Sequence, residues 1–95
     1  MTNKFELTVL AMTEENQEEL IEDITDLVEK YGEVAKFEND GEKRLAYDIK
    51  GQSRACYYFW VIDNLKATER SQITRALDSD ERILRYLLIK SNKRS

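Results

Sequence analysis

Hydrophobic and polar residues alternate along residues 5–12 and then change to a helical spacing. The alternation predicts a strand with one apolar face, formed by Phe5, Leu7, Val9 and Ala11. Further on, the apolar residues recur at the spacing of an amphipathic helix. Its apolar stripe holds Leu20, Ile21, Ile24, Leu27, Val28 and Tyr31. We expect Thr13 to cap the start of this helix and Gly32 to cap its end.

The next stretch, residues 33–50, is extended by pattern but carries Asn39-Asp40-Gly41 in its middle. Asp-Gly is a signal for a tight hairpin, and glycine also serves in a bulge within one long strand. The local pattern leaves both possibilities open. Gly51-Gln52-Ser53 predicts a turn. Residues 55–62 then make the strongest strand, because they are dense in aromatic and β-branched side chains.

Two more elements follow in the last part of the chain. Ile73 and Leu77 lie at helical spacing and predict a short helix over residues 67–78. A polar loop at 78–81 leads to a last strand at 82–90. The order strand, helix, strand therefore occurs twice, which is the ferredoxin-like β-α-β-β-α-β plan of the α+β class. In this plan two helices cover one face of a four-stranded antiparallel sheet, whose strands run fourth, first, third, second.

One face of such a sheet stays open. Alternate residues of the strand at 55–62 point to opposite faces, Tyr57, Phe59 and Val61 to one and Tyr58, Trp60 and Ile62 to the other. The pattern does not say which set lies under the helices. We expect Leu87 and Ile89 to join the open face, where an apolar patch favours a protein partner or simple packing. Base stacking is not favoured, because the aromatic motif of RNA-recognition domains is missing.

The charge is uneven along the chain. The net charge is −4, but residues 1–42 hold three basic and 13 acidic residues, whereas residues 43–95 hold 12 basic and six acidic ones. The acidic total argues against indiscriminate binding of nucleic acid, while the basic half can still form one local basic face. The acidic side of the first helix (Glu15, Glu18, Glu19, Glu22, Asp23, Asp26 and Glu29) is interpreted as a solvated surface.

Several kinds of chemistry lack their usual residues. The chain has no histidine and one cysteine, Cys56, so the commonest general base and the usual zinc ligand sets are missing. We predict no catalytic residue, no metal site and no cofactor. The apolar runs are too short for a membrane span, and the first residues do not resemble a secretory signal. The sequence therefore predicts one domain over residues 1–95 that stays in the cytoplasm, with a core at 4–90 and a short polar tail at 91–95.

The segment Gly41-Glu42-Lys43-Arg44-Leu45-Ala46-Tyr47-Asp48-Ile49-Lys50 resembles the signature of a known family. The family is that of the sixth protein of the bacterial small ribosomal subunit, whose signature is a glycine, a basic pair, Leu-Ala-Tyr, any residue and Ile. The first strand, with its aromatic residue and glutamate, and the last strand, with Arg85 and Lys90, also resemble the family. The likeness covers residues 4–92. It implies one long bulged strand through Gly41, and it differs from the family at Asp48, where proline is usual.

The resemblance implies a function. Family members are structural proteins of the small ribosomal subunit that catalyse nothing. They bind the central domain of the small-subunit ribosomal RNA as a pair with ribosomal protein eighteen of the same subunit. For this chain we therefore expect an RNA-binding ribosomal protein of the cytoplasm that is a monomer when free.

Basic residues along the second strand, its turn and the first and last strands are the candidates for phosphate contacts. They are Lys4, Lys43, Arg44, Lys50, Arg54, Arg85 and Lys90. The alternative is that these charges are solvated and keep edge strands from aggregating. The candidates for contact with the partner protein are Leu45, Tyr47, Ile49, Tyr57 and Phe59, because the second strand is an edge that can pair with a partner segment.

Other functions use the same fold. A small-molecule sensor needs a glycine-rich loop before the first helix, but residues 11–15 are Ala-Met-Thr-Glu-Glu, which would repel anions. An enzyme of the acylphosphatase kind needs an arginine in that loop, and none is present. A domain that binds only another protein remains an alternative, which salt-dependent affinity for RNA would distinguish.

Overall fold

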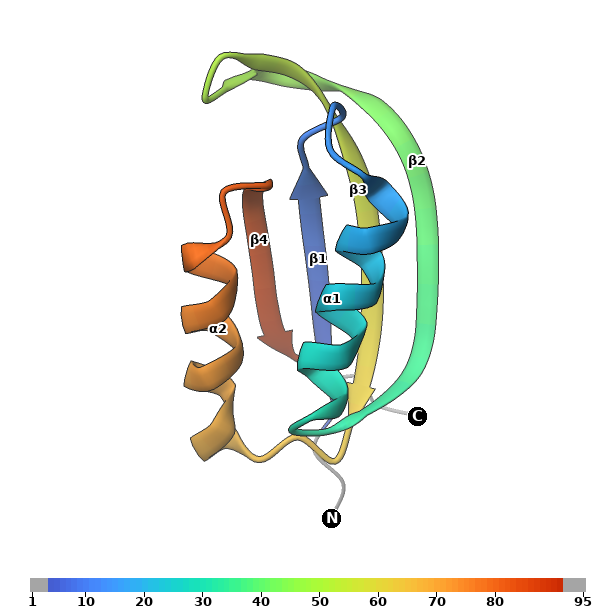
Figure 1. Cartoon of the computed structure of the whole chain (residues 1–95). Coiled ribbons are helices and arrows are strands. Elements are labelled where there is room, and N and C mark those ends of the chain that lie inside the picture. Colours follow the sequence, from blue (N-terminus) through green and yellow to red (C-terminus); the bar gives the residue numbers. More distant parts are fainter. Residues whose placement is uncertain (1–3, 92–95) are drawn as a thin grey trace.

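The computed structural model describes residues 4–91 and contains four strands and two α-helices in the predicted order. The strands are β1 (Phe5–Ala11), β2 (Glu33–Ile49), β3 (Gln52–Asp63) and β4 (Ile83–Lys90). The helices are α1 (Gln17–Glu29) and α2 (Arg70–Ser79), the latter preceded by a short 3₁₀ turn, Ala67–Glu69. The sheet runs β2-β3-β1-β4, so the ferredoxin-like fold and the predicted strand order are confirmed. Figure 1 shows α1 lying across β1 and β3, with α2 beside β4.

The core lies between the sheet and the helices. Pairing of the strands places Phe37, Trp60, Leu7 and Leu88 in one row across the sheet, on the face that the helices cover. Trp60 is fully buried there, and its indole N–H donates a hydrogen bond to Thr25 Oγ1 of α1 at 3.1 Å. The other core residues of this face include Phe5, Val9, Tyr58 and Ile62 from the sheet and Leu20, Ile24, Val28, Ile73 and Leu77 from the helices.

The first helix begins later than predicted. Asn16, not Thr13, is the N-cap, and its side chain accepts a hydrogen bond from the Glu19 N–H at 3.1 Å. The side-chain amide of Gln17 donates to the carbonyls of Met12 and Glu15, which holds the loop before the helix in a turn of its own. The prediction that Thr13 caps the helix was therefore wrong, because side chains further along fix this loop.

Gly32 also has a different role from the one predicted. The helix ends at Glu29 with Lys30 as its C-cap. Gly32 does not adopt the left-handed conformation of a capping glycine, although its N–H still donates to the Val28 carbonyl at 2.8 Å. A Cβ at Gly32 would lie 3.0 Å from both the Asp63 carbonyl oxygen and the Ile62 Cγ2. The glycine is therefore needed because the chain passes close to β3.

The second strand is one long bulged strand, as the resemblance implied. The pairing of β2 with β3 shifts between Asn39 and Gly41, and Gly41 has a φ of 79°. The turn that follows lies at Lys50 and Gly51, with φ values of 51° and 79°, and not at 51–53 as predicted. In Figure 1 the β2–β3 hairpin extends beyond the other two strands and curls over that end of the sheet.

Charged side chains tie the second half to the first helix. Arg82, which precedes β4, donates to the Asp80 carboxylate and to Asp23 Oδ2 of α1, at 2.6 Å and 3.0 Å. The hydrogen bonds from Arg82 lower the pKa of Asp80 below its usual value, despite partial burial. Among the described residues, no helix is long and apolar enough to cross a membrane.

Candidate RNA and partner interface

The face of the sheet that the helices leave open is built from rows of paired residues. One row crosses the sheet through Lys36, Val61, Glu6 and Ile89, and the next through Glu38, Phe59, Thr8 and Leu87. A third row runs through Gly41, Tyr57, Leu10 and Arg85, and Lys43 lies beyond it opposite Ala55. These rows bring residues from all four strands onto a single surface.

An apolar band runs across this open face. Its members are Tyr57, Phe59 and Val61, which are half-buried, and Leu87 and Ile89, which are 56% and 42% exposed. This answers the question that the sequence left open, since Tyr58, Trp60 and Ile62 are the set under the helices. The predicted place of Leu87 and Ile89 on the open face is confirmed.

A second apolar cluster supports the end of the open face nearest the β2–β3 hairpin. Its buried members are Leu45, Ala55 and Leu84, and Tyr57 and Ile49 pack against them. Leu45 is only 9% exposed and so offers little of its side chain to a partner. Tyr47, two residues later, is 78% exposed. The predicted partner residues thus lie close together, but Leu45 forms the base of the surface and Tyr47 projects from it.

Three of the predicted RNA-contacting cations lie at the open face. Lys43 places its ammonium 5.3 Å from the centre of the Tyr57 ring, Arg85 stands at the β4 end of that same row, and Lys4 comes directly before β1. Lys4 is also 3.7 Å from an Asp63 carboxylate oxygen. Sequence analysis missed Lys36, which pairs with Val61 on this face and forms an ion pair with Glu38 at 2.9 Å. The alternation of Lys36, Phe37 and Glu38, with the polar residues on one side and the aromatic residue on the other, was the signal that could have found it.

The other predicted cations do not share this face. Arg44 and Arg54 are paired opposite each other in the hairpin, and the alternation along β3 places both on the side of the sheet that the helices cover. Arg54 also forms an ion pair with Glu42. Lys90 pairs with Phe5 and so also belongs to that side, at the end of β4. In the described part of the chain, Lys43, Arg44, Lys50, Arg85 and Lys90 make no ion pair within the distance of a salt bridge.

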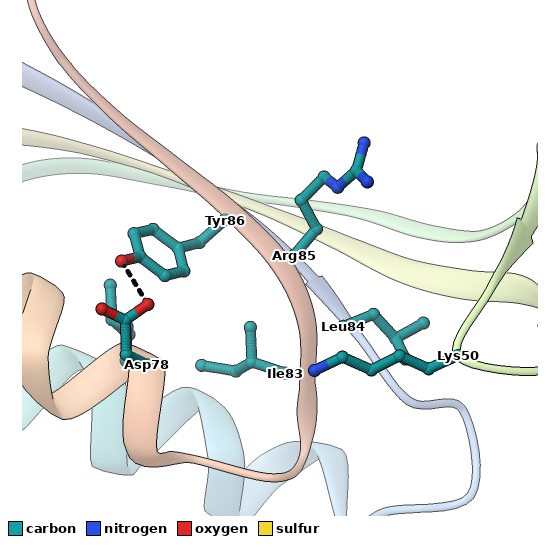
Figure 2. Close-up of a pocket in the computed structure, with 7 residues that line it drawn as sticks. Lys50, Asp78, Ile83, Leu84, Arg85 and Tyr86 are labelled. Atoms are coloured by element: carbon teal, nitrogen blue, oxygen red, sulfur yellow. Dashed lines mark hydrogen bonds between the residues drawn. The ribbon is translucent and has the colours of Figure 1, made fainter.

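Lys50 lies at the hairpin turn, beside the start of β4. It lines a hollow of about 190 Å³ together with Leu77, Asp78, Ile83, Leu84, Arg85 and Tyr86. Figure 2 shows the Lys50 side chain extending toward Ile83, while the Arg85 side chain points away from Asp78 and Tyr86. The Tyr86 hydroxyl donates to the Asp78 carboxylate at 2.6 Å, and this hydrogen bond raises the pKa of Tyr86 to about 12. The phenol therefore stays protonated and serves to join α2 to β4.

The exposed side of α1 carries the opposite charge. The exposed residues of α1 include six carboxylates, Glu18, Glu19, Glu22, Asp23, Asp26 and Glu29. No group of three or more His, Cys, Asp or Glu side chains within residues 4–91 is arranged to hold a metal ion. The open face thus carries Lys4, Lys36, Lys43 and Arg85 beside the apolar band, and the exposed side of α1 carries a cluster of carboxylates.

Comparison with known proteins gives consistent results. The sequence model of the family described as Ribosomal protein S6 matches residues 4–90. The small ribosomal subunit protein bS6 of Chlamydia muridarum is 29% identical over 84 residues, which covers 87% of this chain and 74% of that protein. The corresponding protein of Chlamydia trachomatis serovar D is 27% identical over the same length.

Two further matches are to a solved structure and to part of a longer protein. A crystal structure of 30S ribosomal protein S6 from Thermotoga maritima superposes with a TM-score of 0.89 at 18% identity, and the match covers 96% of this chain and 89% of that one. This likeness supports the fold. A chloroplast protein of Arabidopsis thaliana, Regulator of fatty acid composition 3, is 36% identical over 67 residues, but the match covers only 21% of its length.

Proposed function

Because the chain belongs to the ribosomal protein S6 family, and is thus a structural protein of the small ribosomal subunit, we propose that it binds the central domain of the small-subunit ribosomal RNA. It does so together with ribosomal protein eighteen of that subunit, in the bacterial cytoplasm and without catalysing a reaction. The observation that carries this proposal is the open face of the sheet, where cations border an apolar band.

The apolar band favours a protein partner. A patch that combines half-buried aromatic rings with exposed aliphatic side chains is costly to leave in water, and a partner that covers it gains that free energy. Tyr57 and Phe59 would lie at the centre of the contact, with Leu45 beneath Tyr57. Tyr47 and Ile49 would meet the partner along the β2 edge, where a segment of protein eighteen can pair with the strand.

The cations favour the RNA. Lys43 and Arg85 border the band and have no carboxylate partner among the described residues, so they are free to neutralise phosphates. Arg44, Lys50 and Lys90 would extend the contact around the hairpin and the end of β4. Lys4 must leave its ion pair with Asp63, and Arg54 its ion pair with Glu42, before either can contact a phosphate. Their expected contribution to RNA affinity is therefore smaller. The carboxylates of α1 would orient the molecule by repelling RNA from the helix side.

Removal of Lys43 and Arg85 tests this assignment. The double variant Lys43→Ala/Arg85→Ala should bind a central-domain RNA fragment more weakly in the presence of protein eighteen. Each lost phosphate contact flattens the plot of log affinity against log salt concentration by about 0.7–0.9, so the slope should fall by about 1.4–1.8. Fluorescence anisotropy at several salt concentrations measures both quantities.

A matched control removes the same charges elsewhere. Lys66→Ala/Arg75→Ala deletes one exposed lysine and one exposed arginine outside the four strands, so it lowers the net charge equally and should leave the slope unchanged. Equal effects of the two double variants would mean that only total charge matters, and the assignment of the open face would be wrong.

A further inference from the structure

The β4 strand is an outer edge of the sheet, and half of its backbone groups point away from the sheet. At its end, the Ser91 N–H donates to the Lys4 carbonyl at 2.7 Å. Antiparallel pairs alternate between residues that exchange hydrogen bonds and residues that do not. With Lys90 opposite Phe5 and Leu88 opposite Leu7, the backbone groups of Leu88 are directed away from β1.

One side chain occupies the outward carbonyl of Leu88. Arg70, the first residue of α2, donates a hydrogen bond from its guanidinium group to this oxygen. The same guanidinium lies 5.8 Å from the centre of the Phe5 ring, which is a second contact that holds the side chain in place. An arginine from the helix layer thus closes the middle of an edge that would otherwise be free to pair.

The side chains beside this point would suit a second copy of the chain. Leu87 and Ile89 flank Leu88, and both are exposed on the open face. If two β4 strands paired antiparallel about Leu88, Leu87 of each copy would lie directly opposite Ile89 of the other. The same register would use the Leu88 N–H and carbonyl of both copies as the central hydrogen-bonded pair. The carbonyl that Arg70 occupies is therefore the one that this pairing needs.

We propose that β4 is a latent self-pairing edge and that Arg70 keeps it closed by occupying the Leu88 carbonyl. Two copies of the chain would otherwise join their sheets through β4. The arginine maintains a monomer whose open face and β2 edge stay available. An edge strand with exposed aliphatic side chains needs such protection, because unpaired backbone groups are a template for another strand.

Sedimentation velocity over a wide range of protein concentration tests the proposal. Arg70→Met keeps an aliphatic stem over Phe5 but cannot donate to Leu88, so this variant should form a dimer as concentration rises. In each dimer of the variant, the two Leu88 carbonyls that Arg70 would otherwise bind are free to accept hydrogen bonds from the other copy. We therefore expect a dissociation constant for the dimer at least about tenfold below that of the unaltered chain. Arg75→Met removes the same charge from an exposed position of the same helix and should remain monomeric.

The expected interface can be tested in the same background. Adding Ile89→Lys to Arg70→Met places two lysines beside the join and should restore the monomer. The proposal is overturned if Arg70→Met stays monomeric while its circular dichroism is that of the folded chain, if Arg75→Met dimerises equally, or if the Ile89→Lys addition has no effect. Arg70→Gln, whose shorter side chain also releases the carbonyl, provides the same test if the methionine variant does not fold.

Discussion

Two leucines of the open sheet face allow its supporting and exposed residues to be separated by experiment. Leu45 is 9% exposed and packs with Ala55 and Leu84, whereas Leu87 is 56% exposed. Both can be changed to alanine, which deletes the same atoms. We expect Leu45→Ala to lower the stability of the free chain by much more than Leu87→Ala does.

The size of each effect follows from burial. Truncation of a buried leucine costs about 2–5 kcal/mol, and the small cluster around Leu45 can partly collapse, so we expect about 2–3 kcal/mol for Leu45→Ala. Full burial of a leucine side chain is worth about 1.5–3 kcal/mol, of which Leu87 realises less than half, so Leu87→Ala should cost about 0.5–1 kcal/mol.

Urea unfolding followed by circular dichroism measures both effects. With a slope of about 1.5 kcal/mol per molar urea, Leu45→Ala should lower the midpoint by about 1.3–2 M and Leu87→Ala by less than about 0.7 M. The slope itself should not change, because the fold and the area exposed on unfolding stay the same. Equal midpoint shifts, or a loss below about 1 kcal/mol for Leu45→Ala, would refute the assignment of Leu45 to a buried supporting cluster.

Other predictions concern the helix cap, an acidic side chain and the close approach at Gly32. Asn16→Ala removes the acceptor for the Glu19 N–H and should cost about 1 kcal/mol in urea unfolding, whereas Asn16→Asp should cost little. Arg82 lowers the pKa of Asp80 from its usual 3.8, so this carboxylate stabilises the fold above that pH, and the contribution is lost as the pH falls through the lower folded pKa. The stability gap between the unaltered chain and Asp80→Asn should therefore be present at neutral pH and shrink in acid, and a gap independent of pH would contradict this. Gly32→Ala should lower the melting temperature because its Cβ would press on the Asp63 carbonyl, and an unchanged melting temperature would show that the backbone can move aside.

The elements and their order could be predicted from the sequence because local patterns determine them. The alternation of β1 and the stripe of α1 identify the buried sides of both elements, and these predictions are confirmed by the burial of Leu7, Val9, Leu20 and Ile24. The bulge at Gly41 was not determined by the local pattern. The resemblance to a family decided it, since Asp-Gly fits a hairpin and a bulge equally well.

Features that depend on contacts distant in sequence could not be predicted. The cap at Asn16 depends on a loop held by Gln17, and the need for glycine at position 32 depends on the carbonyl of Asp63. Which face of β3 lies under the helices depends on the packing of Trp60 against α1. The division of the predicted cations between two sides of the sheet depends on strand register and bulges, which a list of basic residues does not contain.

The contact between Arg70 and β4 also has no local signal in the sequence. The sequence shows a basic residue at the start of a helix, and only the packing of α2 beside β4 brings its guanidinium to the Leu88 carbonyl. Edge protection of this kind is a property of the tertiary structure.

The proposed function requires that the open face bind ribosomal RNA together with protein eighteen. Fluorescence anisotropy of a central-domain RNA fragment, with this chain alone, with protein eighteen alone and with both, at low and high salt, tests it most directly. We predict tight binding only when both proteins are present, with an affinity that falls steeply as salt rises. Absence of binding in every combination, or binding that protein eighteen does not strengthen, would contradict the claim.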